Sequence, residues 1–183
     1  MKTRLSKITY VIQAFVLAVL VATDQVTKVF ARTRLNPANG GDTIDVIKGV
    51  FSLHYLENRG SIWGILQGKV DFLLIVSILL FVILVYVYIR LPKEKQYLWL
   101  LWADTAMIAG AVGNTIDRIA MGYVTDFLYF ELINFPIFNF ADCCITVSAV
   151  LIVVLVLTRY KNDNFEFLFP RKKGKKEDDD SET

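Results

Sequence analysis

Four long apolar stretches set the pattern of the chain, and short polar or charged segments separate them. They cover residues 8–31, 70–89, 97–116 and 141–157 approximately. A helix needs roughly 20 apolar residues to cross the hydrocarbon core of a bilayer, and each stretch meets that length. The first is too long, and too polar at its far end, for a cleavable signal peptide. The pattern therefore predicts an all-α polytopic membrane protein with four transmembrane helices.

Composition supports lipid as the solvent. Of the 183 residues, 55% are hydrophobic, and the mean hydropathy is +0.47, which is too apolar for an ordinary soluble domain of this size. The net charge of +2 says little by itself, because the charges lie at the ends and in the turns. The basic run at 171–176 follows a transmembrane stretch, so topology explains it and no nucleic-acid binding is expected.

The positions of lysine and arginine predict the orientation. Three segments that four crossings place on one side are rich in these residues: Lys2, Arg4 and Lys7; Arg90, Lys93 and Lys95; Arg159, Lys161 and the run at 171–176. Positively charged segments stay in the cytoplasm. Both termini are therefore predicted to be cytoplasmic, with residues 32–69 and 117–140 as outer loops.

The outer loops carry structure of their own. Residues 44–46 and 51–55 alternate apolar and polar positions around a Lys48-Gly49 turn, which predicts a small hairpin. Residues 123–130 read as another short strand, and the apolar segment 60–66 suits a short interfacial helix. We expect a small extracytoplasmic β-sheet, a single membrane-embedded domain over residues 1–160, and a charged, disordered cytoplasmic tail over 161–183.

Four carboxylates from different segments are predicted to meet at the outer membrane face. Ionisable groups in or beside a spanning helix are costly, so each one requires a reason. The four are Asp24, Asp117, Asp126 and Asp142. A cluster of this kind points to a functional site rather than to a solvated surface.

Amides and an arginine accompany these acids at helical spacing. Asn114 precedes Asp117 by three residues, and Asn139 precedes Asp142 by three, where it suits a helix cap. With Arg118, these donors keep part of the cluster ionised. Two carboxylates a few ångströms apart share one proton, so one acts as base toward water and the other as acid toward an amide carbonyl. Such hydrolysis requires neither a metal nor a cofactor, and none is expected. The neighbours Cys143 and Cys144 are read as buried, unpaired thiols.

Five short motifs occur in order along almost the whole chain. They are Asp24-Gln25-x-x-Lys28, Asn58-Arg59-Gly60, Gly113-Asn114-x-x-Asp117-Arg118, Val124-x-Asp126-Phe127 and Phe138-Asn139-x-Ala141-Asp142. Each motif alone is weak. In this order on a four-span scaffold, the set resembles bacterial lipoprotein signal peptidase, also called signal peptidase II.

The resemblance implies an aspartyl endopeptidase of the bacterial cytoplasmic membrane that works near the outer face. Its substrates would be prolipoproteins cut before a diacylglyceryl-modified cysteine, and the enzyme would be a monomer in contact with membrane lipid. The dyad carries over to Asp126 and Asp142. The supporting and substrate-binding residues would be Asp24, Lys28, Asn58, Arg59, Gly60, Asn114, Asp117, Arg118 and Asn139.

Two positions depart from the family pattern. Ser61 stands where the family commonly has alanine, and Asp104 stands in the third helix where the family is usually apolar. We assign Asp104 no family role and expect it to be non-catalytic.

Simpler interpretations accompany the catalytic one. Asp24 suits an ordinary intrahelical pair with Lys28, four residues on. Asp126 suits an edge charge on a solvated loop, and Asp142 a favourable charge at a helix N-terminus. Asn114 and Asn139 suit caps or contacts between helices.

Two other functional classes use the same acids. A proton-coupled transporter would use Asp24, Asp104 and Asp117 as relay sites spaced through the membrane, although most of the acids lie at one end. A non-enzymatic assembly subunit would use the polar cluster to hold helices together.

Overall fold

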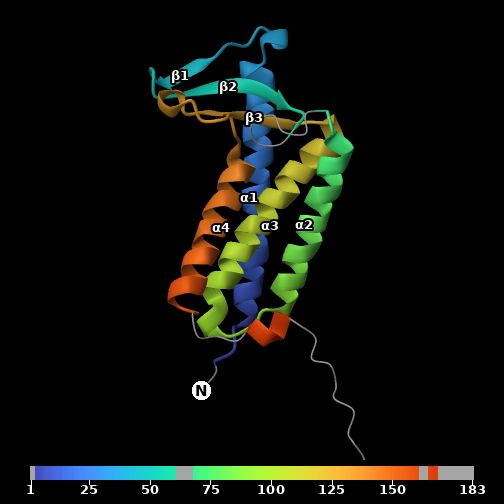
Figure 1. Ribbon diagram of the computed structural model, residues 1–183, viewed down its shortest axis with the longest axis vertical. Coiled ribbons are helices and arrows are strands. Elements are labelled where there is room, and N and C mark those ends of the chain that lie inside the picture. The colour runs from blue at the N-terminus through green and yellow to red at the C-terminus, as the bar shows by residue number, and fades with distance from the viewer. Residues whose placement is uncertain (1–2, 61–67, 161–164, 169–183) are drawn as a thin grey trace, which may run out of the picture.

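The protein is a helical bundle with a small sheet at one end (Figure 1). The computed structural model describes residues 3–60, 68–160 and 165–168. Its long helices are α1 (Lys7–Phe30), α2 (Val70–Arg90), α3 (Leu98–Met121) and α4 (Phe140–Thr158). The predicted fold class, mostly helical with a small sheet, is confirmed. The prediction of an interfacial helix and the Ser61 departure fall on residues outside the described ranges.

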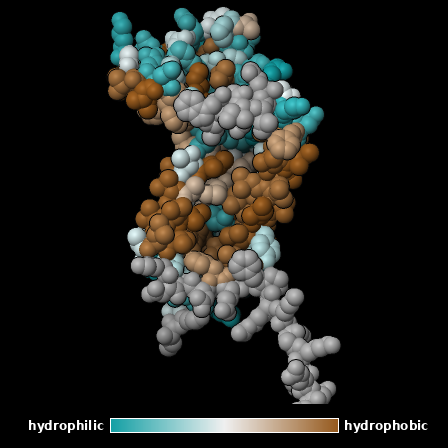
Figure 2. Space-filling model, in the orientation of Figure 1, coloured by the Kyte–Doolittle hydropathy of each residue, from teal (hydrophilic) through white to brown (hydrophobic). Residues whose placement is uncertain are grey.

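Three helices of the described residues are long and apolar enough to cross a membrane. They are α2, α4 and α1 together with the π-helical turn η1 (Ala31–Leu35), which continues it. Apolar side chains cover the bundle as a belt, brown in Figure 2, and many are exposed in the way that lipid-facing residues are. The prediction of membrane-spanning helices is therefore met on both length and apolarity by three stretches.

The stretch predicted at 97–116 differs because it lies at the centre of the bundle. α3 is as long as α1, but twelve of its residues are buried, against two in α2. A helix that faces protein on most sides can carry polar residues that a lipid-facing helix cannot. α3 also continues to Met121, beyond the predicted end, because Asp117 is buried against protein partners. It stops at Gly122, whose φ of 72° is left-handed.

Small residues bring α3 and α4 into close contact. A Cβ atom added at Gly110 would lie 2.5 Å from the backbone oxygen of Ala141 and 2.8 Å from Cγ1 of Ile145. The backbone of Ala141 has little freedom to move, because its N–H donates to Asp24 at 2.9 Å. The glycine therefore sets the distance between the two helices.

Gly110→Ala is expected to lower the free energy of unfolding by about 1–3 kcal/mol through overpacking. At an unobstructed helix position the same change stabilises by up to about 1 kcal/mol, so the sign of the effect is diagnostic. Thermal unfolding in detergent micelles measures it. A raised Tm would contradict the close approach.

The sheet contains the predicted hairpin and the third strand predicted at 123–130. β1 (Ile44–Ile47), β2 (Phe51–Asn58) and β3 (Val124–Tyr129) pair antiparallel in the order β1-β2-β3. The register sets Leu56 opposite Asp126 and Asn58 opposite Val124. Asn58 therefore lies diagonally from Asp126 on the same side of the strand pair.

The sheet is fixed to the bundle by an apolar cluster at the end of α1. Ala31 and Leu35 of η1 are buried against Phe127 of β3. Because α1 runs directly into this cluster, side chains of α1 and of the sheet keep a defined relation.

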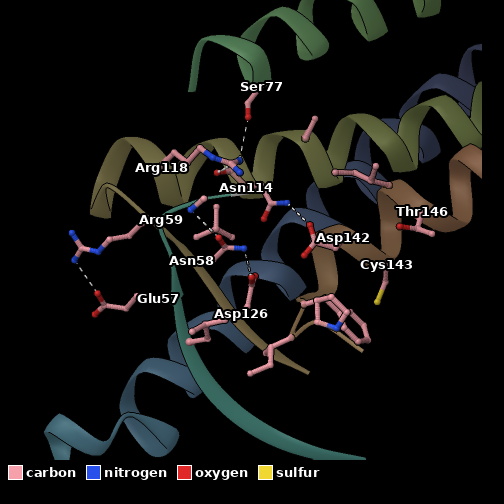
Figure 3. A pocket seen from close by; sticks show the side chains of 18 of the residues that line it. Glu57, Asn58, Arg59, Ser77, Asn114, Arg118, Asp126, Asp142, Cys143 and Thr146 are labelled. Atoms are coloured by element: carbon pink, nitrogen blue, oxygen red, sulfur yellow. Dashed lines mark hydrogen bonds and ion pairs between the residues drawn. The ribbon is translucent and has the colours of Figure 1, made fainter. Parts of the chain in front are cut away.

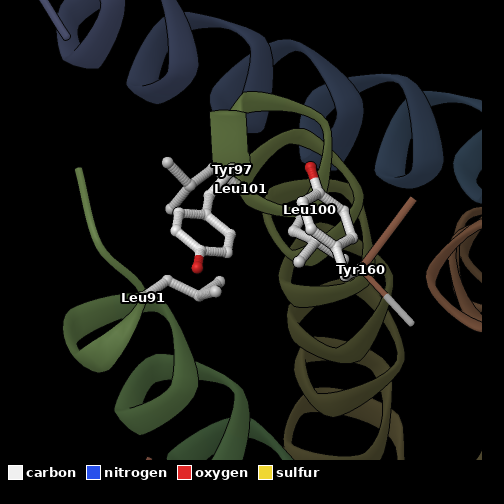
Figure 4. Packing of buried hydrophobic residues seen from close by; sticks show 5 residues of the cluster. All are labelled: Leu91, Tyr97, Leu100, Leu101 and Tyr160. Carbon is white, nitrogen blue, oxygen red and sulfur yellow. The ribbon is translucent and has the colours of Figure 1, made fainter. Parts of the chain in front are cut away.

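The opposite end of the bundle closes around a second cluster (Figure 4). Its buried members are Leu91, Tyr97, Leu100, Leu101 and Tyr160.

Four residues of the predicted tail are folded, which corrects that prediction for them. Phe165–Leu168 form a 3-10 helix, and the ring of Phe167 lies 5.6 Å from that of Tyr97. Phe165 and Phe167 bury apolar surface that a charge-based prediction of disorder overlooks. The rest of the predicted tail, 161–164 and 169–183, lies outside the described residues.

Candidate active site

A cavity of about 730 Å³ lies between the sheet and the adjoining parts of α2, α3 and α4. Asp126 and Asp142 both line it, and so do Asn58, Asn114 and Arg118. Figure 3 shows a different asparagine reaching each carboxyl group, Asn58 for Asp126 and Asn114 for Asp142. Residues from four segments of the chain therefore meet at the cavity; of the four carboxylates expected to converge, Asp126 and Asp142 line it, while Asp24 and Asp117 do not.

Asp126 is buried on β3 and held by two amides. Its Oδ2 accepts a hydrogen bond from Asn58 Nδ2 at 2.7 Å, and its Oδ1 accepts one from Asn139 Nδ2 at 2.6 Å. Its exposed fraction is 1%, so it is not an edge charge on a solvated loop. The carboxyl group is fixed in orientation and removed from bulk water.

The Asn58-Arg59-Gly60 turn explains why Asn58 can serve Asp126. The N–H of Gly60 donates to Asn58 Oδ1 at 2.9 Å. With its oxygen occupied, the amide turns its NH₂ group toward the carboxylate. Arg59 lies farther out, where it pairs with the exposed Glu57 at 2.9 Å.

Asp142 sits in the first turn of α4 inside a reciprocal cap. Asn139 Oδ1 accepts from the N–H of Asp142 at 3.0 Å, and Asp142 Oδ2 accepts from the N–H of Asn139 at 3.1 Å. The predicted cap is confirmed, and it is a capping box. Asn114 Nδ2 donates to the remaining oxygen, Oδ1, at 2.8 Å.

Asn139 joins the two acids. Its side-chain oxygen and backbone N–H hold Asp142, while its Nδ2 holds Asp126. It is fully buried. Because both carboxyl groups are hydrogen-bonded to Asn139, this one residue holds them close to each other.

A buried charge cluster supports this pair. Lys28 Nζ lies 2.9 Å from Asp24 Oδ2, 3.5 Å from Asp117 Oδ2 and 2.9 Å from Asn114 Oδ1. The Asp24–Lys28 pair expected from the spacing exists, but it is buried at the centre of the site rather than exposed. Because Lys28 occupies the oxygen of Asn114, the NH₂ group of that amide is directed to Asp142.

Asp24 and Asp117 position backbone as well as charge. Asp24 Oδ1 accepts from the N–H of Ala141 at 2.9 Å, and Asp117 Oδ2 accepts from the N–H of Thr125 at 2.9 Å. Ala141 directly precedes Asp142, and Thr125 directly precedes Asp126. Asp24 and Asp117 therefore hold the backbone beside the two carboxylates that line the cavity.

Two contributors, Arg32 and Ser77, were not predicted from the sequence. Arg32 lies 3.5 Å from Asp117 and donates to Thr125 Oγ1 at 2.9 Å. Its spacing, eight residues after Asp24 and four after Lys28, was a usable signal. Ser77 of α2 accepts from Arg118 Nη1 at 3.1 Å, which the sequence of an apolar helix does not indicate.

Burial and a neighbouring acid together raise the pKa of Asp126. Burial and, second, the negative charge of Asp142 raise the pKa of Asp126 to about 7. The hydrogen bonds from Asn58 and Asn139 and the charge of Lys28 act in the opposite direction. Near neutral pH this arrangement can supply both a proton donor and a proton acceptor.

Asp104 lies outside this cluster. It is 2% exposed within α3, and neither carboxyl oxygen has a hydrogen-bond partner among the described residues. It is not among the residues that line the cavity. Within the same part of the chain, Cys143 and Cys144 are unpaired, as predicted, but they are half-buried rather than buried. No group of three or more His, Cys, Asp or Glu side chains among the described residues is arranged to hold a metal ion.

Comparisons with known proteins agree with the fold and the motifs. A family model described as signal peptidase (SPase) II matches residues 16–158. The lipoprotein signal peptidase of Lactiplantibacillus plantarum is 38% identical over 156 residues, which are 85% of this chain and 98% of the relative. That of Enterococcus faecalis is 33% identical over 147 residues, 80% and 88% of the two chains.

Solved structures give the same result. Two structures described as bacterial membrane enzymes superpose with TM-scores of 0.74 and 0.69, at 31% and 34% sequence identity. They cover 90% and 86% of this chain, and 96% and 97% of their own. Fold and comparisons together define a membrane enzyme, and more closely a protease. The chain belongs to the signal peptidase II family, which confirms the resemblance seen in the motifs.

Proposed function

We propose that this enzyme removes signal peptides from prolipoproteins and cuts before a diacylglyceryl-modified cysteine, with Asp126 and Asp142 as the catalytic dyad. The supporting observation is that Asn139 donates a hydrogen bond to each of the two carboxyl groups, and that both acids line one cavity. The curated relatives named lipoprotein signal peptidase support the substrate class.

In the proposed mechanism one acid of the dyad donates a proton and the other accepts one. The two carboxyl groups share one proton, and we assign it to Asp126, whose pKa is raised to about 7, with Asp142 as the base. Asp142 takes a proton from water as the water oxygen bonds to the scissile carbonyl carbon, while Asp126 donates to the carbonyl oxygen. Collapse of the tetrahedral intermediate breaks the C–N bond: the proton on Asp142 passes to the leaving amine of the cysteine, and one hydroxyl group of the intermediate returns its proton to Asp126 as the carbonyl re-forms.

The supporting residues are already positioned around this pair before the reaction begins. Asn58, Asn114 and Asn139 fix the carboxyl orientations, and Lys28 offsets the charge of Asp142. Such preorganised groups lower the barrier because they need no reorientation during the reaction. One chain supplies both acids and their shell, which supports action as a monomer.

The position of the cavity suits a lipid-anchored substrate. Its lining is apolar beside α2 and α4, with Leu80, Ile145 and Val147. Lys7, Arg90 and Arg159 terminate helices at the end of the bundle away from the sheet. Positive charge at that end supports its placement in the cytoplasm, with the dyad near the outer face.

Paired precursors test the substrate assignment. The purified enzyme in lipid vesicles is expected to cleave a prolipoprotein that carries diacylglyceryl-cysteine and to leave the same precursor intact when that cysteine is unmodified. The lipid anchor raises the local concentration of substrate in the bilayer and fills apolar surface. Equal cleavage of both precursors would contradict the assignment.

The pH profile tests the proton on Asp126. Since the pKa of Asp126 is raised to about 7, its proton is present below that pH, and kcat/KM is expected to fall as pH rises through it. Asn58→Ala removes a donor that favours the carboxylate, so the pKa rises and the falling limb moves to higher pH. A hydrogen bond to a charged group contributes about 1.5–3 kcal/mol, which corresponds to a shift of roughly one unit or more.

Asn39→Ala is the matched control for the pH profile. Asn39 is an exposed amide whose side chain bonds the backbone of Arg32, and its removal is expected to leave the limb in place. A limb that stays in place in Asn58→Ala, or moves to lower pH, would contradict the role of Asp126 as the proton donor.

A further inference from the structure

The loop at residues 130–138 leaves the end of β3 and returns beside it. Leu128 and Phe138 exchange backbone hydrogen bonds of 2.8 and 3.0 Å at its base. At its outer end are the short 3-10 helix η5 (Glu131–Ile133) and Asn134, whose φ is 48°. The chain therefore forms a closed projection rather than an open connection to α4.

This loop is held by specific contacts. The ring of Phe130 lies 5.0 Å from that of Phe51 and 5.6 Å from that of Phe138. Ser52 Oγ donates to Glu131 Oε1 at 2.5 Å. These contacts fix the loop against β2, so the direction of the side chains at its outer end is determined by the fold.

Apolar side chains stand exposed at that outer end. Leu132 is 71% exposed and Ile133 is 68% exposed, as much as Val11 on the lipid-facing side of α1 at 69%. The backbone nitrogen of Leu132 lies 3.4 Å from the oxygen of Val50, in the turn after β1. Ile47, the last residue of β1, is 57% exposed. We call Ile47, Leu132 and Ile133 the apolar tip.

The apolar tip overhangs the bundle. Figure 1 shows η5 on the bundle side of the sheet, at the end that projects beyond α4. Figure 2 shows an apolar patch at this projecting end, above the belt of the helices. Large exposed apolar groups on the rim of a membrane protein mark a membrane or partner contact.

We propose that the apolar tip inserts into the lipid leaflet on the sheet side of the bilayer. The loop that carries it lies on the bundle side of the sheet, and the exposed apolar residues of the helices extend to Phe30 at the end of α1, next to the sheet. Lys48 follows Ile47 in the turn and is exposed, which places a positive charge where anionic headgroups would lie.

Lipid contact at the apolar tip also bears on the cavity. Phe135 and Phe138 of the same loop line it. Insertion of one part of the loop would therefore fix the depth of the cavity mouth in the leaflet that holds a lipid-anchored substrate. This consequence rests on the proposed function; the insertion itself does not.

Fluorescence quenching by brominated lipid tests the insertion. Full-length Leu132→Trp is reconstituted in vesicles of phosphatidylethanolamine and phosphatidylglycerol, with and without bromine on the acyl chains, and the wild-type signal is subtracted. Insertion predicts blue-shifted emission that is quenched by the brominated chains. Ala38→Trp, on η2 (Pro37–Asn39) at the far side of the sheet from the bundle, is the control and should not be quenched.

Emission from Leu132→Trp that matches the control in both vesicles would overturn the inference. So would a blue shift that depends on the protein-to-lipid ratio without quenching by bromine, because it would indicate contact with a second copy. No substrate is present, so either result leaves the proposed peptidase activity untouched.

Discussion

Asp126→Asn and Asp142→Asn are each expected to abolish cleavage of a diacylglyceryl-modified precursor while the protein folds and inserts normally. Asparagine keeps the shape of the side chain but supplies neither the base nor the acid. Proton transfer by a positioned group contributes typically 10²–10⁴-fold, and the two acids act as a unit, so a loss of about 10³-fold or more in kcat/KM is expected from either change. Precursor cleavage in reconstituted vesicles measures it.

Asp104→Asn is the matched control for both variants. Asp104 is a buried aspartate of the same bundle that does not line the cavity, and its replacement is expected to keep kcat/KM near the wild-type value. Retained cleavage in Asp126→Asn or Asp142→Asn would contradict the dyad. Loss of cleavage in Asp104→Asn with normal folding would instead favour a role for acids outside the cavity.

Lys28→Met is expected to produce the largest loss of stability. The side chain is fully buried between Asp24 and Asp117 and hydrogen-bonded to Asn114. Methionine fills much of the space but leaves two buried carboxylates without their shared cation. Breaking a buried ion pair from one side costs about 3–5 kcal/mol. Denaturant or thermal unfolding in micelles measures the change in the free energy of unfolding.

Arg59→Met is the control for the lysine variant. Arg59 also pairs with a carboxylate at 2.9 Å, but its side chain is 58% exposed, and exposed pairs contribute about 0–1 kcal/mol. Similar stability losses in the two variants would show that burial of Lys28 does not matter. Restoration of stability by Asp24→Asn in the Lys28→Met background would support charge imbalance as the cause.

The helices and strands were predictable because each has a strong local pattern. The runs that became α1, α2 and α4 have the length and apolarity that only a lipid-facing helix requires. Alternation at 51–55 identified β2, and the aromatic and branched residues at 123–130 identified β3, whose first four residues are buried in succession. The start of α3 was predictable but its end was not. Protein partners for Asp117 allow the polar end of this helix to stay buried, which an apolar stretch in the sequence does not indicate.

The site was predictable in its residues but not in its connections. Ordered motifs identified Asp24, Lys28 and Asp117, yet helical spacing alone favours an exposed Asp24–Lys28 pair. Only the packing of α1 against α3 and the start of α4 makes that pair central. Arg32 and Ser77 belong to no motif, and their contacts depend on where η1 and α2 lie in three dimensions.

The link between Asp126 and Asp142 can be measured by following the carboxyl carbon resonance of Asp126 through a pH titration of the reconstituted enzyme. The dyad predicts a pKa for Asp126 near the value of about 7 that burial and Asp142 produce, and a lower pKa in Asp142→Asn, where the neighbouring negative charge is gone. A pKa for Asp126 that does not change in Asp142→Asn would show that the two acids do not share a proton, and would contradict the mechanism.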